Sequence, residues 1–313
     1  MSGDLRVRPG RPEDVEALKV IRLEALGDTP DAFGDTLETV EHWSDEQWRE
    51  KARLWNYYLA EVDGSVVGMA SGASNDSRPG TCWLFAMYVT PAQRGSGAAR
   101  ALVERVSTWA LVSGADALYL YVARAVPRAR AFYAKAGFVP TGTTVTMHRD
   151  ESLVLDEMRR DLGALSFHVE PVSPEALYDL RRRVLRRNDP SAEVTNPGDT
   201  LETTRHYGGL VGDQVVVSAT FLAGPAPFDP DVAAYQLRYM ATDFDLQGRG
   251  LGARTLRGAL DDLASRGVTR VWANARVSAL DFYVIEGWEI VPDSFFVSAE
   301  SGVDHVVIHR DLP

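Results

Sequence analysis

A glycine-rich segment and a Phe-Tyr pair each occur twice in the chain, at nearly the same separation. Gly97 and Gly250 are 153 residues apart, and Tyr133 and Tyr283 are 150 residues apart. The first glycine-rich segment reads Arg-Gly-Ser-Gly-Ala-Ala and the second reads Gln-Gly-Arg-Gly-Leu-Gly. A repeat of this length is far too long for a solenoid and matches a whole domain. The sequence therefore predicts two similar domains in one chain.

The length of the chain fits this prediction. It has 313 residues, enough for two domains of about 150 residues each. We expect domains at 1–162 and 165–313, joined by a short linker at 162–164. With 45% hydrophobic and 25% charged residues, the composition is that of a globular protein. The lack of a long apolar run predicts no membrane span and no signal peptide.

Charge and cysteine usage limit the classes of partner. The net charge is −11, with −3 in residues 1–160 and −8 in the remainder, which argues against nucleic acid. The acidic balance favours a cationic partner such as an amine. The single cysteine, Cys82, fits a reducing cytoplasm and is expected to be a packed core thiol. No His/Cys cluster has the spacing of metal ligands, so we expect no metal.

Local patterns predict individual elements. Ser44 and Gln47 form a capping box that starts a helix, with Trp43 stapled onto Trp48. Trp48 and Trp55 share one helical face and are expected in the core. Asp63-Gly64 and Gly212-Asp213 predict hairpins. The arginine-rich helix end at 181–187 is expected to be a solvated face, with an anion or substrate patch as the alternative.

Each glycine-rich segment follows an apolar, strand-like run and opens a helix. Such a turn aims backbone N–H groups and the positive end of the helix dipole at one spot, which suits a phosphate. A Walker A loop is excluded, because no Gly-Lys-Ser/Thr follows. Gly248 and Gly250 formally match a dinucleotide fingerprint, but residues 270–274 lack the expected ribose-binding acid. A loop that only turns the chain remains an alternative.

The two motifs together resemble those of the GNAT superfamily of acetyl-CoA-dependent N-acetyltransferases. The family loop, Gln/Arg-x-x-Gly-x-Gly/Ala, is matched by Gln247, Gly250 and Gly252. The later family motif, Ala-x-x-Phe-Tyr-x-x-x-Gly-Phe, is matched by Ala279, Phe282, Tyr283 and Gly287, with Trp288 as its last aromatic residue. The first half departs from the family where an asparagine commonly lies seven residues before the tyrosine, because it has Val126 there.

The resemblance implies an α/β (α+β) fold in each half. Each domain would have a mixed, mostly antiparallel sheet, in which two adjacent central strands splay apart to admit acetyl-CoA. In the second half, the implied cofactor-binding residues are Met240, Ala241, Thr242, Gln247, Gly248, Arg249, Gly250, Leu251, Gly252 and Asn274. In the first half, they are Met87, Tyr88, Val89, Arg94, Gly95, Ser96, Gly97, Ala98 and Ala99.

The implied reaction is direct attack of an amine on the thioester carbonyl. Tyr283 and Tyr133 match the position of a general acid that protonates the leaving thiolate. Residues that could act as the base are Asp199, Glu202, His206 and His305 in the second half and Glu38 in the first.

The second half is favoured as the main active half, because its loop keeps its glycines and its charge is more acidic. The acceptor is expected to be a small-molecule amine, and the protein a cytoplasmic monomer or homodimer without nucleic-acid or membrane partners. Two alternatives remain: a non-catalytic acyl-CoA-binding or regulatory protein, and an acetyltransferase similar to mycothiol synthase.

Overall fold

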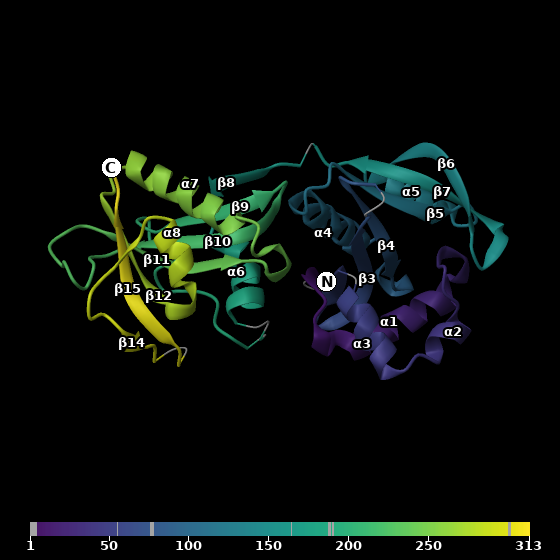
Figure 1. The fold of residues 1–313 in the computed structure, drawn as a ribbon, viewed down its shortest axis with the longest axis horizontal. Coiled ribbons are helices and arrows are strands. Elements are labelled where there is room, and N and C mark those ends of the chain that lie inside the picture. Colours follow the sequence, from purple (N-terminus) through teal and green to yellow (C-terminus); the bar gives the residue numbers. More distant parts are fainter. Residues whose placement is uncertain are drawn as a thin grey trace. The chain divides into compact units, whose positions relative to one another are not determined.

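The chain forms two compact units, each with its own sheet (Figure 1). Unit 1 comprises Met1–Leu165 and unit 2 comprises Ser166–Pro313. The computed structural model describes residues 5–54, 56–75, 78–163, 165–186, 189, 191–299 and 302–313. Among these residues, no helix is long and apolar enough to cross a membrane.

The sheet of unit 1 has the strand order β1-β2-β3-β4-β5-β7-β6. Its strands are β1 (Leu5–Pro9), β2 (Asn56–Val62), β3 (Ser65–Ser74), β4 (Thr81–Val89), β5 (Ala117–Ala123), β6 (Val139–Met147) and β7 (Asp150–Asp161). Only the β4–β5 pair is parallel, and every other neighbouring pair is antiparallel.

The sheet of unit 2 repeats this order as β13-β15-β12-β11-β10-β9-β8, with β14 also pairing with β15. Its strands are β8 (Phe167–Pro171), β9 (Arg205–Val211), β10 (Gln214–Ala223), β11 (Tyr235–Thr242), β12 (Arg270–Arg276), β13 (Glu289–Ile290), β14 (Phe296–Val297) and β15 (Asp304–Asp311). The β11–β12 pair is again the parallel one. These two mixed, mostly antiparallel sheets confirm the predicted fold class.

Several of the helices occupy matching places along the two halves. In unit 1 they are η1 (Pro12–Asp14), α1 (Val15–Asp28), η2 (Pro30–Ala32), α2 (Leu37–Glu41), α3 (Asp45–Leu54), η3 (Pro91–Gln93), α4 (Ala98–Val112) and α5 (Pro127–Lys135). In unit 2 they are α6 (Glu175–Leu180), η4 (Arg181–Leu185), η5 (Phe244–Leu246), α7 (Leu251–Ser265), η6 (Val277–Ala279) and α8 (Leu280–Ile285). The long helices α4 and α7 each connect the two parallel strands of their unit.

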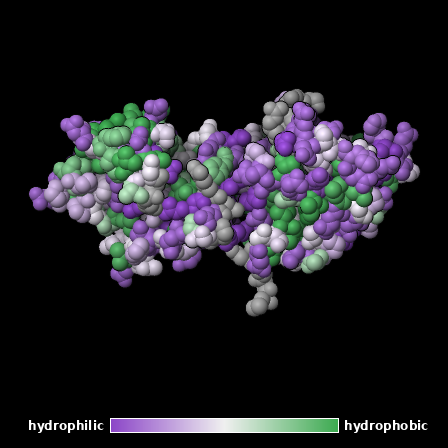
Figure 2. Space-filling model, turned by 90° about the horizontal axis from the view of Figure 1, so that it is seen from below, coloured by the Kyte–Doolittle hydropathy of each residue, from purple (hydrophilic) through white to green (hydrophobic). Residues whose placement is uncertain are grey.

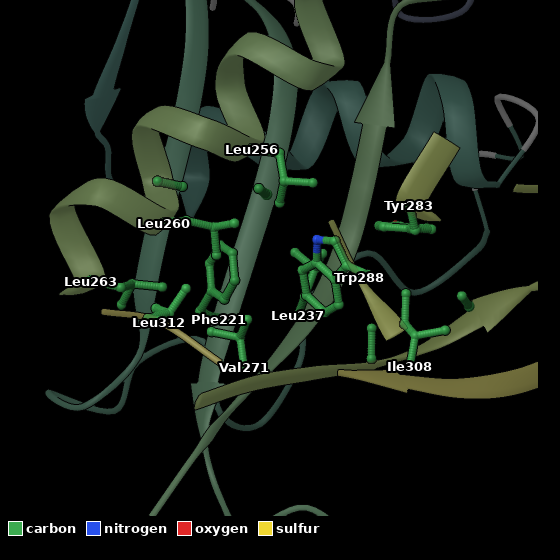
Figure 3. Packing of buried hydrophobic residues seen from close by; sticks show 14 of the residues in the cluster. Phe221, Leu237, Leu256, Leu260, Leu263, Val271, Tyr283, Trp288, Ile308 and Leu312 are labelled. Atoms are coloured by element: carbon green, nitrogen blue, oxygen red, sulfur yellow. The ribbon is translucent and has the colours of Figure 1, made fainter. Parts of the chain in front are cut away.

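The core of unit 2 lies between α7 and one face of the sheet (Figure 3). Leucines one helical turn apart on α7 pack against apolar side chains of the central strands; they are Leu256, Leu260 and Leu263, facing Phe221, Leu237 and Val271. This spacing gives the helix one apolar stripe. Burying that stripe fixes how α7 lies on the sheet, and it leaves the opposite face of the sheet to other elements.

Several local predictions are confirmed. The Ser44 backbone N–H donates to the Gln47 side chain at 2.8 Å, and the Gln47 N–H donates back to Ser44 Oγ at 3.3 Å. The Trp43 and Trp48 rings pack edge to face, and Trp48 is buried, as is Cys82. Both predicted hairpins form, as β2–β3 and β9–β10. Trp55 lies outside the described residues.

The arginine-rich segment corrects one prediction. Arg181 and Arg183 are buried, not solvated, and each pairs with a carboxylate, Asp199 and Asp243 respectively. A buried guanidinium is tolerated only when it is paired and hydrogen-bonded. The carboxylate partners lie 18 and 60 residues away in the sequence, so the local charge pattern does not reveal them.

On the face shown in Figure 2, hydrophilic residues are interspersed with apolar groups in both units. The exposed large hydrophobic residues of unit 2 include Ile285 and Phe295. Apolar residues scattered over the surface are normal for a folded protein. The candidate site is therefore sought in the geometry of the sheets and not in surface hydropathy.

Candidate active site

The two parallel strands of unit 2 separate and open a cleft. Backbone pairing between β11 and β12 covers Tyr235–Leu237 and Val271–Ala273 and then stops. Both strands continue, β11 to Thr242 and β12 to Arg276. The cleft has a volume of about 690 Å³ and is lined by the diverging strand ends, η4, the loop before α7, and α8. A cavity of this size suits a small-molecule ligand.

A β-bulge at Tyr239 shapes one wall of the cleft. The pairing of β10 with β11 shifts register between Ser218 and Thr220, and Tyr239 has a φ of 54°. Positive φ is unfavourable for a bulky residue and persists only where surrounding contacts enforce it. Here Ser218 Oγ donates to the Tyr239 carbonyl at 2.7 Å, and Asn196 Nδ2 donates to the Tyr239 hydroxyl at 3.1 Å.

A buried ion pair supports the same residue from behind. Arg181 Nη1 donates to Asp199 Oδ2 at 2.7 Å, and both side chains are 1% exposed. The Arg181 guanidinium carbon lies 4.2 Å from the centroid of the Tyr239 ring. His206 completes the group, with Nδ1 3.0 Å from Thr220 Oγ1 and Nε2 2.9 Å from the Asp199 carbonyl oxygen. The strained strand segment is therefore held by a fully buried polar network.

The glycine-rich loop adjoins the cleft at the start of α7. Gly248 and Gly250 have φ values of 73° and 75°, a conformation that glycine adopts without strain. Gly252 lies in the first turn of α7, where an added Cβ would come within 3.2 Å of Thr242 Oγ1 and 3.5 Å of Met240 Cε. Glycine at position 252 therefore keeps this end of the cleft open.

The structure brings together most of the predicted cofactor residues of unit 2. Those that line the cleft are Met240, Ala241, Thr242, Gln247, Gly252 and Asn274. Gly248, Arg249 and Gly250 lie on the exposed loop beside it, and Leu251 is buried below the loop. Gln247 Nε2 donates to the Thr242 carbonyl at 3.0 Å, which fixes the loop to the end of β11.

Tyr283 lines the cleft from α8 and is 8% exposed. Its ring packs edge to face against Phe282 and Trp288, with centroids 5.0 and 5.5 Å apart. Burial raises the pKa of the Tyr283 hydroxyl to about 12, because a phenolate loses its hydration in an apolar site. The hydroxyl is therefore protonated at neutral pH and able to donate a proton.

Unit 1 repeats this geometry. The pairing of β4 with β5 stops at Trp83 and Tyr119, and a bulge places Ala86 at a φ of 50°. Gly95 and Gly97 have φ values of 90° and 97°. The two loops thus have glycine at the same two left-handed positions, so the expected backbone advantage of the second loop is not found there.

The other predicted residues of unit 1 lie around the end of β4. Tyr88 and Val89 are buried, Met87 is half-buried, Ser96 is exposed, and Ala98 and Ala99 begin α4. Burial and the Glu24 carboxylate, which accepts a hydrogen bond from the Tyr88 hydroxyl at 3.1 Å, raise the pKa of Tyr88.

Arg94 and Tyr133 complete the unit 1 counterpart. Arg94 Nε donates to the Val89 carbonyl at 3.3 Å, the contact that Gln247 makes in unit 2, and its guanidinium also pairs with Asp28. Tyr133 is 8% exposed, and burial raises its pKa. The first residue of each loop therefore holds the strand end.

The proposed bases have different surroundings. Asp199 and His206 are buried in the network behind Tyr239, where their polar atoms already have partners. Glu202 and Glu38 are exposed. His305 lines the cleft, stacks on Phe296 with centroids 5.6 Å apart, and has Nδ1 2.8 Å from the Val303 carbonyl oxygen. His305 alone among these five candidates is part of the cleft lining.

Three arginines line the cleft, and none of them was predicted as a catalytic or cofactor-binding residue. Arg238 pairs with Thr220, whose hydroxyl accepts a hydrogen bond from Arg181 of η4. Paired residues in adjacent strands project to the same face of a sheet, so Arg238 faces η4. Arg186 and Arg276 also line the cleft. Among the described lining residues there is no aspartate or glutamate.

Comparison with known families supports this geometry. Residues 22–138 match the model of the acetyltransferase (GNAT) family. This segment lies within unit 1 and contains its splayed strands, its glycine-rich loop and Tyr133. Residues 22–138 thus match a GNAT acetyltransferase domain, which is a class of acyltransferase enzyme.

Individual relatives agree with this class. An uncharacterized N-acetyltransferase of Bacillus subtilis is 28% identical over 144 residues, which cover 46% of this chain and 95% of the relative. An uncharacterized N-acetyltransferase of Mycobacterium tuberculosis is 39% identical over 84 residues, covering 27% of this chain and 53% of the relative. The mycothiol acetyltransferase of Thermobispora bispora is 31% identical over 136 residues, covering 42% of this chain and 44% of that relative.

Solved structures include a putative acetyltransferase from Salmonella typhimurium with its cofactor acetyl-CoA. It is 22% identical, has a TM-score of 0.41, and covers 54% of this chain and 99% of that chain. Among the described residues of the present protein, no group of three or more His, Cys, Asp or Glu side chains is arranged to hold a metal ion.

Proposed function

We propose that the protein is an acetyl-CoA-dependent N-acetyltransferase that acetylates a small-molecule amine, with unit 2 as the main active half. The proposal is carried by one observation: the cleft between β11 and β12 is lined both by six of the predicted cofactor residues and by Tyr283. The domains follow the boundaries 1–162 and 165–313, and unit 1 provides a second acyl-CoA-type site.

The shape of the cleft fits the acyl donor. Met240, Ala241 and Thr242 form an unpaired strand edge along which the pantetheine arm would lie. The N–H groups of residues 248–252 and the positive end of α7 would hold the pyrophosphate. Arg249 and, in unit 1, Arg94 would add positive charge near the phosphates. The open space beside Gly252 fits this path, since a Cβ there would crowd Thr242.

The chemistry follows from the protonation state of Tyr283. The acceptor nitrogen attacks the thioester carbonyl, a C–N bond forms, and the C–S bond breaks. The departing thiolate takes the proton of the Tyr283 hydroxyl, which its raised pKa of about 12 keeps in place at neutral pH. His305, in the lining of the cleft, would accept the proton that the acceptor ammonium must lose.

Release of free thiol from acetyl-CoA, measured across a panel of small amines, tests the proposal. We expect amine-dependent thiol release from the wild-type protein with at least one class of acceptor. Equilibrium binding of acetyl-CoA, measured on the same preparation, is the control. Tight binding of acetyl-CoA without thiol release for any amine would instead favour the non-catalytic acyl-CoA-binding protein.

A further inference from the structure

We propose that unit 1 has a binding site for an organic ammonium ion, formed by the aromatic rings of Trp83, Tyr119 and Tyr121 and by the carboxylate of Glu157. In the structure, the guanidinium of Arg78 occupies this site. A ligand with a cationic group would take its place. The inference concerns unit 1 alone and requires no acetyl transfer, so it goes beyond the proposed function.

The three rings lie on the face of the sheet away from α4. An added Cβ at Gly72 would meet a side chain of α4, so Gly72 faces that helix. Leu84 pairs with Gly72 and shares its face, and the adjacent Trp83 projects to the other face. The Trp83 ring centroid lies 5.5 Å from that of Tyr119 and 4.8 Å from that of Tyr121. These side chains therefore form one continuous aromatic surface.

A buried carboxylate borders this surface. Glu157 of β7 pairs directly with Tyr121 of β5, and its side chain is 4% exposed. The Tyr121 hydroxyl donates to Glu157 Oε2 at 3.4 Å, and Thr141 Oγ1 donates to Oε1 at 2.9 Å. Both donors are neutral, so the hydrogen bonds leave the negative charge uncompensated. A charge buried to this degree requires a cationic partner.

Arg78, from the connection between β3 and β4, supplies that partner only loosely. Its Nη1 atom lies 3.6 Å from Glu157 Oε2, which is longer than a hydrogen bond. The Arg78 side chain is 46% exposed, and an ion pair with such an exposed member contributes little. Its guanidinium carbon lies 4.8 Å from the centroid of the Tyr119 ring. A cation thus reaches the carboxylate from the side of the rings, and a weakly held one can be displaced.

The chemistry of the surface favours an organic ammonium ion. The faces of tryptophan and tyrosine rings attract such ions, and the attraction is stronger where water is excluded. Tyr121 is 37% exposed, so a ligand can reach its ring. The carboxylate adds a full negative charge beside the rings. Charge and apolar contact together therefore select a ligand that is both cationic and organic.

The site is a property of unit 1. Asn274 and Val307 of unit 2 occupy the places of Tyr121 and Glu157. Neither of these side chains is aromatic or charged. A cation that depends on the ring and the carboxylate should therefore bind to unit 1 only.

A matched pair of ligands tests the inference. Choline and 3,3-dimethylbutan-1-ol have the same shape, but only choline carries a positive charge. Their binding to the full chain is measured by calorimetry without an acyl donor. We expect choline to bind about 10-fold or more tightly than the neutral alcohol, because a desolvated cation on an aromatic face gains at least this much.

Two variants with opposite expected effects locate the site. Glu157→Gln keeps an acceptor for Thr141 and Tyr121 but removes the charge, so it should weaken choline binding by about 10-fold or more. Arg78→Gln removes the internal competitor and should strengthen choline binding by about 2- to 5-fold, the strength of an exposed ion pair. A folding defect would not strengthen binding.

Arg160→Gln is the matched control. Arg160 also lies on β7 but pairs with Glu104 of α4, on the opposite face of the sheet, so choline binding should not change. The inference is overturned if the neutral alcohol binds as tightly as choline, if Glu157→Gln leaves choline binding unchanged, or if Arg78→Gln weakens it. Failure of the proposed acetyl transfer would leave these measurements unaffected, since no acyl donor is present.

Discussion

The two units build the same sheet but present different side chains on the face away from the long helix. Phe85 precedes the bulge residue of β4, and Arg238 precedes the bulge residue of β11. Ala123 ends β5, whereas Arg276 ends β12. Unit 1 also gathers aromatic rings here, with Trp83 and Tyr121 centroids 4.8 Å apart.

The Tyr121 hydroxyl donates to Glu157 Oε2 at 3.4 Å, so one of these aromatic residues has a carboxylate partner. Unit 2 has Asn274 and Val307 at the places of Tyr121 and Glu157. The comparison teaches that the positions proposed to hold the cofactor are shared, whereas side chains on the face away from the long helix have diverged. Two sheets of the same strand order thus present different side chains at matching positions.

The largest expected difference between the units concerns one ion pair in each, Arg181–Asp199 in unit 2 and Arg22–Asp35 in unit 1. Asp199→Ala removes the partner of fully buried Arg181 and should destabilise unit 2 by about 3–5 kcal/mol. Asp35→Ala breaks the Arg22–Asp35 pair of unit 1, but Asp35 is 39% exposed, so we expect a loss of about 1 kcal/mol or less. Hydrogen exchange resolved by peptide measures each unit separately. If both variants lost the same free energy of unfolding, the two ion pairs would not differ in their contribution to stability.

Variants of the two tyrosines test which unit is the main catalyst. Tyr283→Phe keeps the ring and removes the proton donor, so binding should survive while kcat falls by about 100-fold or more if protonation limits the rate. Tyr133→Phe should reduce kcat less. With a pKa of about 12 for Tyr283, ionisation of this hydroxyl should not lower the rate between pH 7 and 10. Steady-state kinetics of both variants is the measurement, and the opposite ranking would make unit 1 the main enzyme.

The smallest expected effect sharpens the comparison of the two loops. Gly252→Ala adds a Cβ close to Thr242 and Met240, and it should raise the KM for acetyl-CoA by about 10-fold, which corresponds to about 1.4 kcal/mol. The same change should stabilise α7 by up to about 1 kcal/mol, because alanine favours helix. Ala99→Gly is the reciprocal variant and should destabilise α4 without altering this KM. An unchanged KM in Gly252→Ala would show that the cofactor does not pass this residue.

Features set by neighbouring residues could be predicted from the sequence. The capping box at Ser44, the hairpin turns, the glycines of both loops and the two buried tyrosines depend on short patterns with a single structural outcome. The repeat spacing then places these patterns in two copies of one fold. For this reason the predicted fold class is confirmed, and most of the proposed cofactor residues of unit 2 meet in one cleft.

Features set by strand register could not be predicted. The bulge at Tyr239 arises where the pairing of β11 with β10 shifts register, and nothing near Tyr239 in the sequence encodes this shift. The burial of Arg181 depends in the same way on Asp199 and on Thr220 of β10. A run of arginines resembles a solvated face until the carboxylates that pair with it are placed.

The identical strand order of the two sheets has a consequence for folding. Each unit must close a short parallel pair through a long crossover helix, and parallel pairs of this kind form slowly. During that time the chain contains two sets of strands suited to the same positions, so a strand of one copy could pair in the sheet of the other. Exchange of this kind is a known failure of repeated domains. The divergence at Phe85 and Arg238 therefore also works against misassembly, because a strand in the wrong sheet would bring an arginine among aromatic rings.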